Sequence, residues 1–467
     1  MVFSSLIFLF IFFPLTLFLY FIARNIKTKN FILVVASLIF YSWGEPVWVI
    51  LLIFSSILDY TVSQAIEKHR NKPVTKFYLA VSVIVNLGLL AIFKYSGFFI
   101  STINSAFGLS LPEPAFSLPI GISFYTFQTM SYSIDVYRGN VKAQKSFMNF
   151  LMFVSLFPQL IAGPIVRYSD IEDQISERAV TTEAFSVGMT RFMAGLGKKV
   201  LIANYAGSLA TSLLKDIDSA AVMSVWFGVL FYAFQIYFDF SGYSDMAIGL
   251  GKMFGFDYPE NFKYPYISTS ITEFWRRWHI TLSSFFRDYV YIPLGGNRVG
   301  VPRQILNLFI VWGLTGLWHG ASWNFVLWGL YYFFFLCLEK FIFKKFFAKI
   351  PSPIRWLYSM SVVLVGWMVF YFDDFQTLIT AFSVAFGHTG NAFTDPVSET
   401  LVINNIPFIL IAAIASTPVL NIVRRLVEKS SPLTESILRI VYNIVMLILC
   451  VASLVGSTYN PFLYFRF

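Results

Sequence analysis

Two of the four histidines in this 467-residue chain lie in a stretch between Gln235 and Gly329 that places charged residues among strongly apolar ones. His319 stands in LTGLWHGAS, where its neighbours are apolar or small. Such surroundings disfavour the charged imidazole, so we expect a neutral ring that can accept a proton. That property suits a general base that activates a hydroxyl group for attack on an acyl donor. A histidine that only hydrogen-bonds a neighbouring helix has the same sequence, and the residues alone leave both interpretations open.

The second histidine, His279, lies in TEFWRRWHITLSSFFRDY. On a helix Trp275 and His279 share a face, and Glu273 can pair with Arg276 or Arg277, so we expect an amphipathic or re-entrant helix with a polar side. Its arginines could meet an anionic donor group such as a phosphate at the mouth of a pocket. An amphipathic helix at the membrane interface would have a similar composition. The candidate binding residues here are Trp275, Arg276, Arg277, Trp278, Arg287 and Asp288.

A third polar group stands in FDFSGYSD and contains Asp239, Ser241, Tyr243 and Asp245. These side chains are too polar to face lipid, so they either line a cavity or satisfy one another where a helix breaks at Gly242. The candidate substrate-binding residues in and around this group are Gln235, Asp239, Ser241, Tyr243, Asp245, Trp318 and Asn324.

Three glycines follow this group at a spacing that differs from a dinucleotide-binding loop. Gly249, Gly251 and Gly255 form GxGxxxG, and no strand pattern precedes them. We expect close packing of helices here. The chain also lacks HExxH, a Cys/His cluster, GxSxG, a Walker A sequence and His-x4-Asp, so we expect no metal site, serine hydrolase or nucleotide motor.

The elements that position these residues must be membrane helices. The chain is 57% hydrophobic and only 13% charged, with a mean hydropathy of +0.68. Soluble domains do not have this composition. The net charge of +9 comes from lysines and arginines in short loops, where they set topology, so we expect no nucleic-acid partner.

Apolar segments of about 20 residues predict roughly eleven spanning helices plus one or two re-entrant pieces. We expect an all-α polytopic membrane protein of one domain, residues 1–467, with a catalytic core at about 118–340. The polar face of the 118–139 helix should contact other helices or a water-filled cavity. The apolar segments are 2–23 (a retained first span), two arms within 31–60, 77–95, 118–139, 150–171, 184–214, 220–240, 321–338, 355–372, 401–423 and 437–458.

Seven motifs are spread over most of the chain: PIGISFYTFQTMSYSIDVYRG (119–139), FPQLIAGPIVRY (157–168), QIYFDFSGYSDMAIGLGKMFGF (235–256), NFKYPY (261–266), FWRRWHITLSSFFRDYVYIPLGGNR (274–298), WHG (318–320) and YNPFLYFRF (459–467). Together they resemble the membrane-bound O-acyltransferases, and within them the bacterial branch that includes alginate O-acetylation. The resemblance implies that His319 is the essential histidine of the family and that His279 occupies its second histidine position.

The resemblance further implies a helical fold around a central tunnel, in which a cytoplasmic acyl donor, acetyl-CoA, and an acceptor from the outer side meet near the histidine. It implies residence in the bacterial cytoplasmic (inner) membrane and contact with membrane lipid. Relatives work with exported or periplasmic SGNH-type O-acetyltransferases on an extracytoplasmic glycan such as alginate, cellulose or peptidoglycan. More distant ones D-alanylate teichoic acids.

Two functions of other classes remain open from the residues. A secondary transporter or flippase could use buried histidines and carboxylates as a relay, although transporters usually show paired repeats with broken helices in corresponding places. The second alternative function is that of a scaffold that only recruits an exported transferase. Either would leave acetyl-CoA intact, and a scaffold would tolerate loss of His319.

Overall fold

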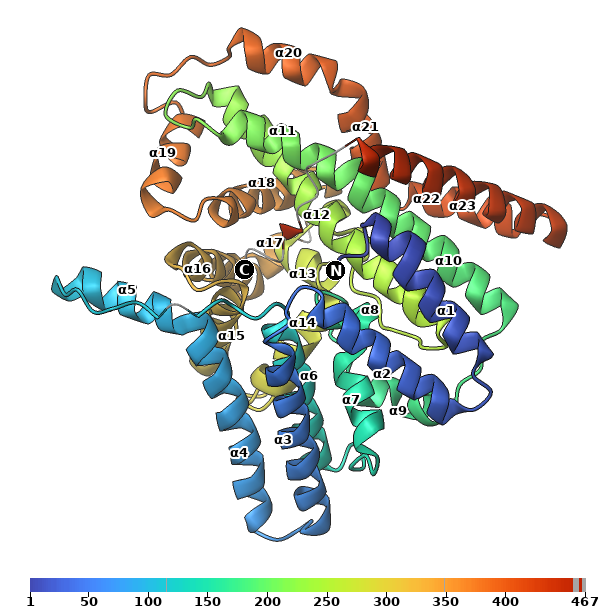
Figure 1. Ribbon diagram of the computed structural model, residues 1–467. Helices are drawn as coiled ribbons and strands as arrows, with labels where there is room; N and C mark the ends of the chain where they lie inside the picture. The colour runs from blue at the N-terminus through green and yellow to red at the C-terminus, as the bar shows by residue number, and fades with distance from the viewer. Residues whose placement is uncertain (115, 348, 457–461, 464–467) are drawn as a thin grey trace. The chain divides into compact units, whose positions relative to one another are not determined.

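The computed structural model describes residues 1–114, 116–347, 349–456 and 462–463, and these residues form helices and no strand (Figure 1). The prediction of an all-α chain is therefore confirmed for the described residues. They divide into two compact units, unit 1 with residues 1–192 and 243–259, and unit 2 with residues 193–242 and 260–467. Two helices contain a boundary between the units: α10 (Thr182–Gly197) and α12 (Val222–Met253).

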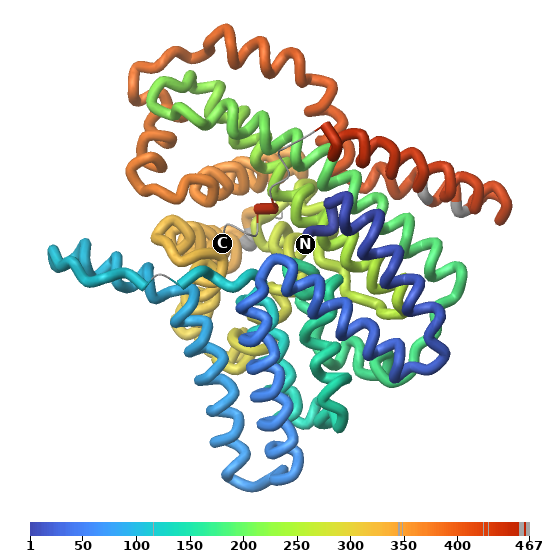
Figure 2. Tube along the Cα trace, in the orientation of Figure 1, coloured from blue at the N-terminus to red at the C-terminus, as the bar shows by residue number. Residues whose placement is uncertain are grey.

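In unit 1 three long helices lie side by side: α3 (Val49–Lys68), α4 (Val74–Leu90) and α6 (Ile122–Arg138) (Figures 1 and 2). Their polar side chains meet at Asp59, which accepts hydrogen bonds from Ser133 and Asn86. The expectation that the polar face of α6 contacts other helices is thus confirmed. The remaining elements are η1 (Phe8–Phe12), α1 (Phe13–Ile22), α2 (Ile26–Ser42), η2 (Ala91–Tyr95), α5 (Ser96–Phe107), α7 (Phe147–Ser155), α8 (Phe157–Leu160) and α9 (Tyr168–Ser176).

Unit 2 contains both histidine segments. Its central helices are α15 (Val301–His319), α16 (Trp323–Cys337) and α18 (Ser352–Tyr371), and α16 packs against both of the others. The remaining elements are η3 (Lys198–Ala203), α11 (Asn204–Leu214), η4 (Pro265–Ile267), α13 (Ile271–Arg277), α14 (Ile280–Phe286), η5 (Arg287–Tyr291), η6 (Leu338–Phe343), α17 (Lys344–Phe347), α19 (Phe375–Ala385), α20 (Pro396–Asn404), α21 (Ile406–Ala415), α22 (Val419–Glu428) and α23 (Pro432–Val455).

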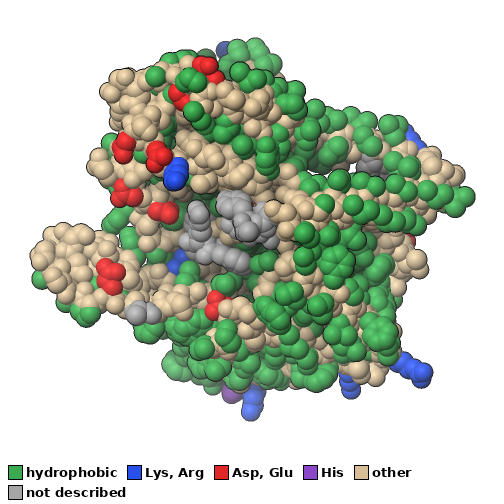
Figure 3. Space-filling view, turned by 45° about the horizontal axis from the view of Figure 1, so that its top comes forward, with side chains coloured by type: hydrophobic (Ala, Val, Ile, Leu, Met, Phe, Trp, Pro, Cys, Tyr) green, Lys and Arg blue, Asp and Glu red, His purple; other side chains and the backbone are tan. Residues whose placement is uncertain are grey.

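Six helices among the described residues are long and apolar enough to cross a membrane, or up to seven if one bent pair counts as a span. The helix at Phe8–Ile22 is apolar but shorter. Exposed hydrophobic side chains are consistent with helices that face lipid. They form broad patches on the drawn face (Figure 3), and α23 exposes Leu433, Ile437 and Ile448. The six spans are Val49–Lys68, Val74–Phe107, Val222–Met253, Trp323–Phe343, Ser352–Tyr371 and Pro432–Val455.

Two sequence expectations about helix breaks were wrong. One of the two interpretations of the polar group placed a helix break at Gly242, but the helix continues as α12 to Met253. Gly242 allows a close approach to the end of α10, since a Cβ there would lie 2.8 Å from the carbonyl oxygen of Gly195. Conversely, the span expected at 401–423 is broken, with α20 and α21 bent by 54°. Pro407 stands in the first turn of α21, and proline cannot continue a helix from the preceding turn.

Gly249 confirms the packing role predicted for the glycine series. A Cβ at Gly249 would lie 2.6 Å from the backbone nitrogen of Phe192 and would overlap atoms of unit 1 at Gly188. Side chains larger than hydrogen therefore cannot fit where α12 meets α10 within this unit.

Candidate active site

His319 is positioned by the close approach of α15 and α16. A Cβ at Gly316 would overlap the carbonyl oxygen of Phe325, and one at Gly329 would overlap that of Trp312. Only glycine at both places lets the two helices pack this tightly. Because α15 ends at His319, the imidazole sits beside the first turns of α16.

Aromatic rings surround His319, which is only 4% exposed. The ring centroids of Trp318, Trp328 and Phe370 lie 5.0, 4.8 and 5.3 Å from that of His319, each at a steep interplanar angle. Aromatic walls of this kind exclude water and disfavour a charged imidazole unless another group compensates it. The expected apolar surroundings of His319 are thus present in the structure.

His279 does not share a helical face with Trp275, and that expectation was wrong. The helix ends at Arg277, a new one begins at Ile280, and His279 between them has a left-handed backbone with φ +44°. The cause is a pairing with an earlier segment: the Lys263 amide donates to the Arg277 carbonyl over 2.9 Å, and the Ile280 amide donates to the Asn261 carbonyl over 3.0 Å. Continuing the helix through residue 279 would break these hydrogen bonds.

The buried side chain of His279 contacts one amide and the rings of Phe240, Phe262 and Trp318, which lie on three segments. Phe240 and Trp318 lie edge-on to it, with centroids 4.6 and 5.8 Å away. Its Nδ1 lies 3.1 Å from Asn261 Oδ1, which also accepts hydrogen bonds from Thr281 N (3.2 Å) and Thr281 Oγ1 (2.9 Å). Neighbouring groups therefore fix both the backbone and the imidazole ring of His279.

Trp318 contacts both histidines, at 5.8 Å from His279 and 5.0 Å from His319. The two imidazoles thus belong to one cluster, although the sequence separates them by forty positions. His279 lies outside the candidate spans, and burial lowers its pKa well below the usual range, with the neighbouring His319 lowering it further. Burial and the neighbouring imidazole therefore both favour the neutral form of His279.

The short helix α13 before His279 is fixed at both ends. Glu339 accepts hydrogen bonds from Ile271 N (2.6 Å) and Thr272 N (2.8 Å) at its start. Carboxylates stabilise the positive end of a helix, so Glu339 anchors α13 to the end of the α16 segment.

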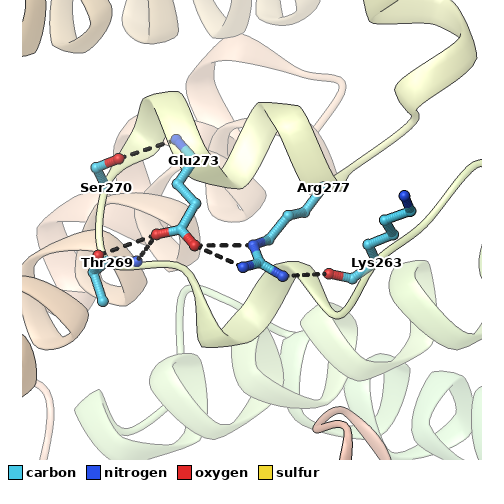
Figure 4. Close-up of polar contacts among 5 residues, drawn as sticks. All are labelled: Lys263, Thr269, Ser270, Glu273 and Arg277. Carbon is cyan, nitrogen blue, oxygen red and sulfur yellow. Dashed lines mark hydrogen bonds and ion pairs between the residues drawn. The ribbon is translucent and has the colours of Figure 1, made fainter.

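A second carboxylate, Glu273, joins the two ends of α13 (Figure 4). It accepts from Thr269 N (2.9 Å), while its other oxygen pairs with Arg277 Nη2 at 2.9 Å. Arg277 also donates to the Lys263 carbonyl over 3.0 Å. The predicted pairing of Glu273 with an arginine is therefore confirmed, and it supports the turn that carries His279.

The other predicted site residues lie in different surroundings. Trp275 and Trp278 are buried among aromatic rings of unit 2, whereas Arg276 is exposed and Arg287 is exposed and pairs with Asp288 at 2.6 Å. Their binding roles remain predictions. Gln235, Ser241 and Asn324 are also buried in unit 2.

Asp239 has structural partners that the sequence did not reveal. It pairs with buried Lys199 at 2.5 Å and accepts a hydrogen bond from the Leu463 amide at 2.8 Å.

Asp245 and Tyr243 lie in unit 1. Asp245 pairs with Arg191 at 2.6 Å, and Phe3 stacks on Tyr243 with ring centroids 4.6 Å apart. Only Phe462 and Leu463 of the motif at 459–467 lie among the described residues.

Sequence reasoning missed three residues that contact the histidines, Asn261, Trp328 and Phe370. It also missed Glu339, which anchors the start of α13. Asn261 stands in the motif NFKYPY, but nothing local indicates that it contacts a residue 18 positions later. Trp328 lies nine positions after His319 on the next helix. The sequence feature that could have indicated their contact is the pair Gly316 and Gly329, which lets α15 and α16 pack closely.

Residues 118–383 match the membrane-bound O-acyltransferase family. The chain belongs to this family. It is 38% identical to a probable alginate O-acetylase of Pseudomonas putida over all of both chains. It is 42% identical to one of Pseudomonas aeruginosa over 80% of this chain and 73% of that one. A peptidoglycan O-acetyltransferase of Helicobacter pylori is 34% identical, over 84% of this chain and 80% of its own.

Membership in the family decides the class of function. The protein is a multi-pass membrane O-acyltransferase, hence an enzyme, as the first of the functions considered from the residues expected. Both histidines and the rings around them lie within the matched range.

Proposed function

We propose that this O-acyltransferase moves acetyl groups from acetyl-CoA to an extracytoplasmic polysaccharide, with His319 as the general base. The observation that carries the proposal is the buried imidazole of His319, walled by aromatic rings and connected through Trp318 to His279. The names of the Pseudomonas and Helicobacter relatives support acetyl as the group and a glycan as the acceptor.

In the proposed reaction His319 accepts the proton of an acceptor hydroxyl, and the oxygen of that hydroxyl attacks the thioester carbonyl. A new C–O ester bond forms, the C–S bond breaks, and the proton passes to the leaving thiolate, giving the free thiol. The cluster around His279 holds the thioester. The exposed guanidinium of Arg276 is available for the anionic part of the donor.

The remaining features of the proposal are architectural. The enzyme has roughly eleven spans around a central tunnel, acts as one domain with its catalytic core at about 118–340, and resides in the bacterial inner membrane. It passes acetyl groups to an exported SGNH-type transferase that completes glycan acetylation. The resemblance of the motifs supports these points.

Replacing His319 by Ala tests the proposal. We expect acetylation of the cell-surface polysaccharide, measured by mass spectrometry, to be abolished while the protein remains inserted. The matched control is His388→Ala, because His388 is exposed and its substitution should change nothing. Undiminished acetylation in the His319 variant would remove the mechanism.

Purified protein tests the donor separately. Incubation with acetyl-CoA labelled in the acetyl group should give thioester cleavage that depends on His319. Intact acetyl-CoA with the unchanged protein would exclude this donor.

A further inference from the structure

We propose that Asn261 is a positioning residue that fixes the tautomer of His279, so that Nδ1 carries the proton and Nε2 is the basic nitrogen. The inference deepens the proposed function, on which it rests for its activity measurements. It assigns a role to a residue that lies 18 positions before the histidine it orients.

The orientation of the Asn261 amide follows from its neighbours. The backbone N–H of Thr281 can only donate, and it points at the side-chain atom of Asn261 from 3.2 Å. That atom must be the oxygen, since the hydrogens of an amide nitrogen there would oppose the Thr281 N–H. Thr281 Oγ1 approaches the same atom at 2.9 Å, and its hydroxyl can donate to that oxygen.

The tautomer of His279 follows from the amide. Nδ1 of His279 lies 3.1 Å from Asn261 Oδ1, which can only accept, so Nδ1 must carry a hydrogen. A neutral imidazole has one N–H, hence its Nε2 carries the lone pair. His279 consequently acts at Nε2 as a hydrogen-bond or proton acceptor.

The backbone of Asn261 strengthens this control. Its carbonyl accepts from the Ile280 amide at 3.0 Å, directly after His279. One residue thus fixes both the left-handed backbone and the ring of His279, and Asn261 is itself fully buried. Such double support restricts the imidazole to one orientation, as second contacts do for catalytic histidines in general.

The first experiment reads the tautomer directly and needs no activity. The chain has four histidines, so ¹⁵N-histidine labelling gives few imidazole signals, and the spectrum of a His279→Gln variant identifies the missing one. We expect His279 to show a protonated Nδ1 and an unprotonated Nε2 at neutral pH. The opposite pattern in the unchanged protein would overturn the proposal, whatever the enzyme acetylates.

The second experiment compares Asn261→Asp with Asn261→Ala. Aspartate keeps an acceptor for Nδ1 and adds a negative charge, so activity should persist and the acidic limb of the kcat–pH profile should move to higher pH. Alanine removes the acceptor, and we expect kcat/KM to fall on the order of 100-fold. His319 is the titratable group whose charge acts on His279, so the ¹⁵N signals of His279 are also followed against pH in His319→Gln, a measurement that needs no activity.

The outcomes separate the two proposals. Equal losses in both Asn261 variants without a shifted pH profile would assign Asn261 a structural role only and overturn the inference. Retained acetylation in His319→Ala would instead overturn the proposed function while leaving the spectroscopic assignment of His279 valid.

Discussion

At the scale of the residue, His279 has a left-handed backbone with φ +44°, which is uncommon for residues other than glycine even though asparagine, aspartate and histidine adopt it more often than the rest. Such a residue persists only where its surroundings over-determine it, and these positions often lie at functional sites. Here the surroundings are the pairing of 261–263 with 277–280 and the Glu273–Arg277 ion pair. The ion pair is half-buried and lies outside the candidate spans, so its charge should respond to pH.

Glu273→Gln tests that response. Burial alone would raise the pKa of Glu273, but hydrogen bonds from Thr269 and Arg277 outweigh it and lower the pKa below its usual value of 4.5. A lowered pKa contributes stability that is present above pH 4.5 and is lost as pH falls through the folded value. We expect the variant to be less stable by up to about 1 kcal/mol at pH 7.

Thermal unfolding in detergent at pH 7 and at successively lower pH measures this difference. The two proteins should converge in stability as the pH falls below 4.5 and through the lowered pKa of folded Glu273, because Glu273 is then protonated as well. A difference that stays constant with pH would show that the charge contributes nothing.

At the scale of the element, the approach of α15 and α16 places His319 among its rings. Gly316 faces the carbonyl of Phe325 at the contact, whereas Gly313, one turn earlier on the same helix, has open space where its Cβ would be. The two glycines therefore form a matched pair for testing the interface.

Gly316→Ala should separate α15 from α16, whereas Gly313→Ala should not. We expect the first to destabilise by about 1–3 kcal/mol through overpacking and to lower acetylation on the order of 100-fold, because a shift of about 1 Å suffices for that. Gly313→Ala should be neutral or slightly stabilising. Quantified acetyl transfer and thermal unfolding check both, and equal behaviour of the two variants would contradict the packing role.

Much of the site could be predicted from local patterns, and the rest depends on distant contacts. The setting of His319 among apolar residues and the Glu273–Arg277 spacing were visible in the sequence. The turn at His279 was not, because a helix through TEFWRRWHITL satisfies every local preference. It breaks only because Asn261 and Lys263 offer hydrogen bonds from another segment. Glu339 likewise stabilises α13 from 68 positions away.

At the scale of the whole molecule, Lys199 and Asp239 form an ion pair with each side chain at most 4% exposed. Removing one member of a buried pair leaves an uncompensated charge, while replacing both by apolar residues is often tolerated. Asp239 was expected to bind substrate, so the same variants also test that prediction.

Asp239→Leu should cost about 3–5 kcal/mol and leave little folded protein, and combining it with Lys199→Met should restore most of the loss. Size-exclusion profiles and thermal unfolding of the two variants and the unchanged protein give the comparison. Failure of the double variant to recover would show that the pair does more than neutralise charge. Acetylation by a recovered double variant would exclude Asp239 from substrate binding.

The contact between Asp239 and the Leu463 amide has a consequence for biosynthesis. The ribosome adds Leu463 224 residues after Asp239, so this donor does not exist while α12 enters the bilayer. During that interval Lys199, already synthesised, can neutralise the charge of the Asp239 carboxylate in the apolar part of the bilayer. The order of translation therefore makes the lysine the early stabiliser of membrane insertion and the amide a late one.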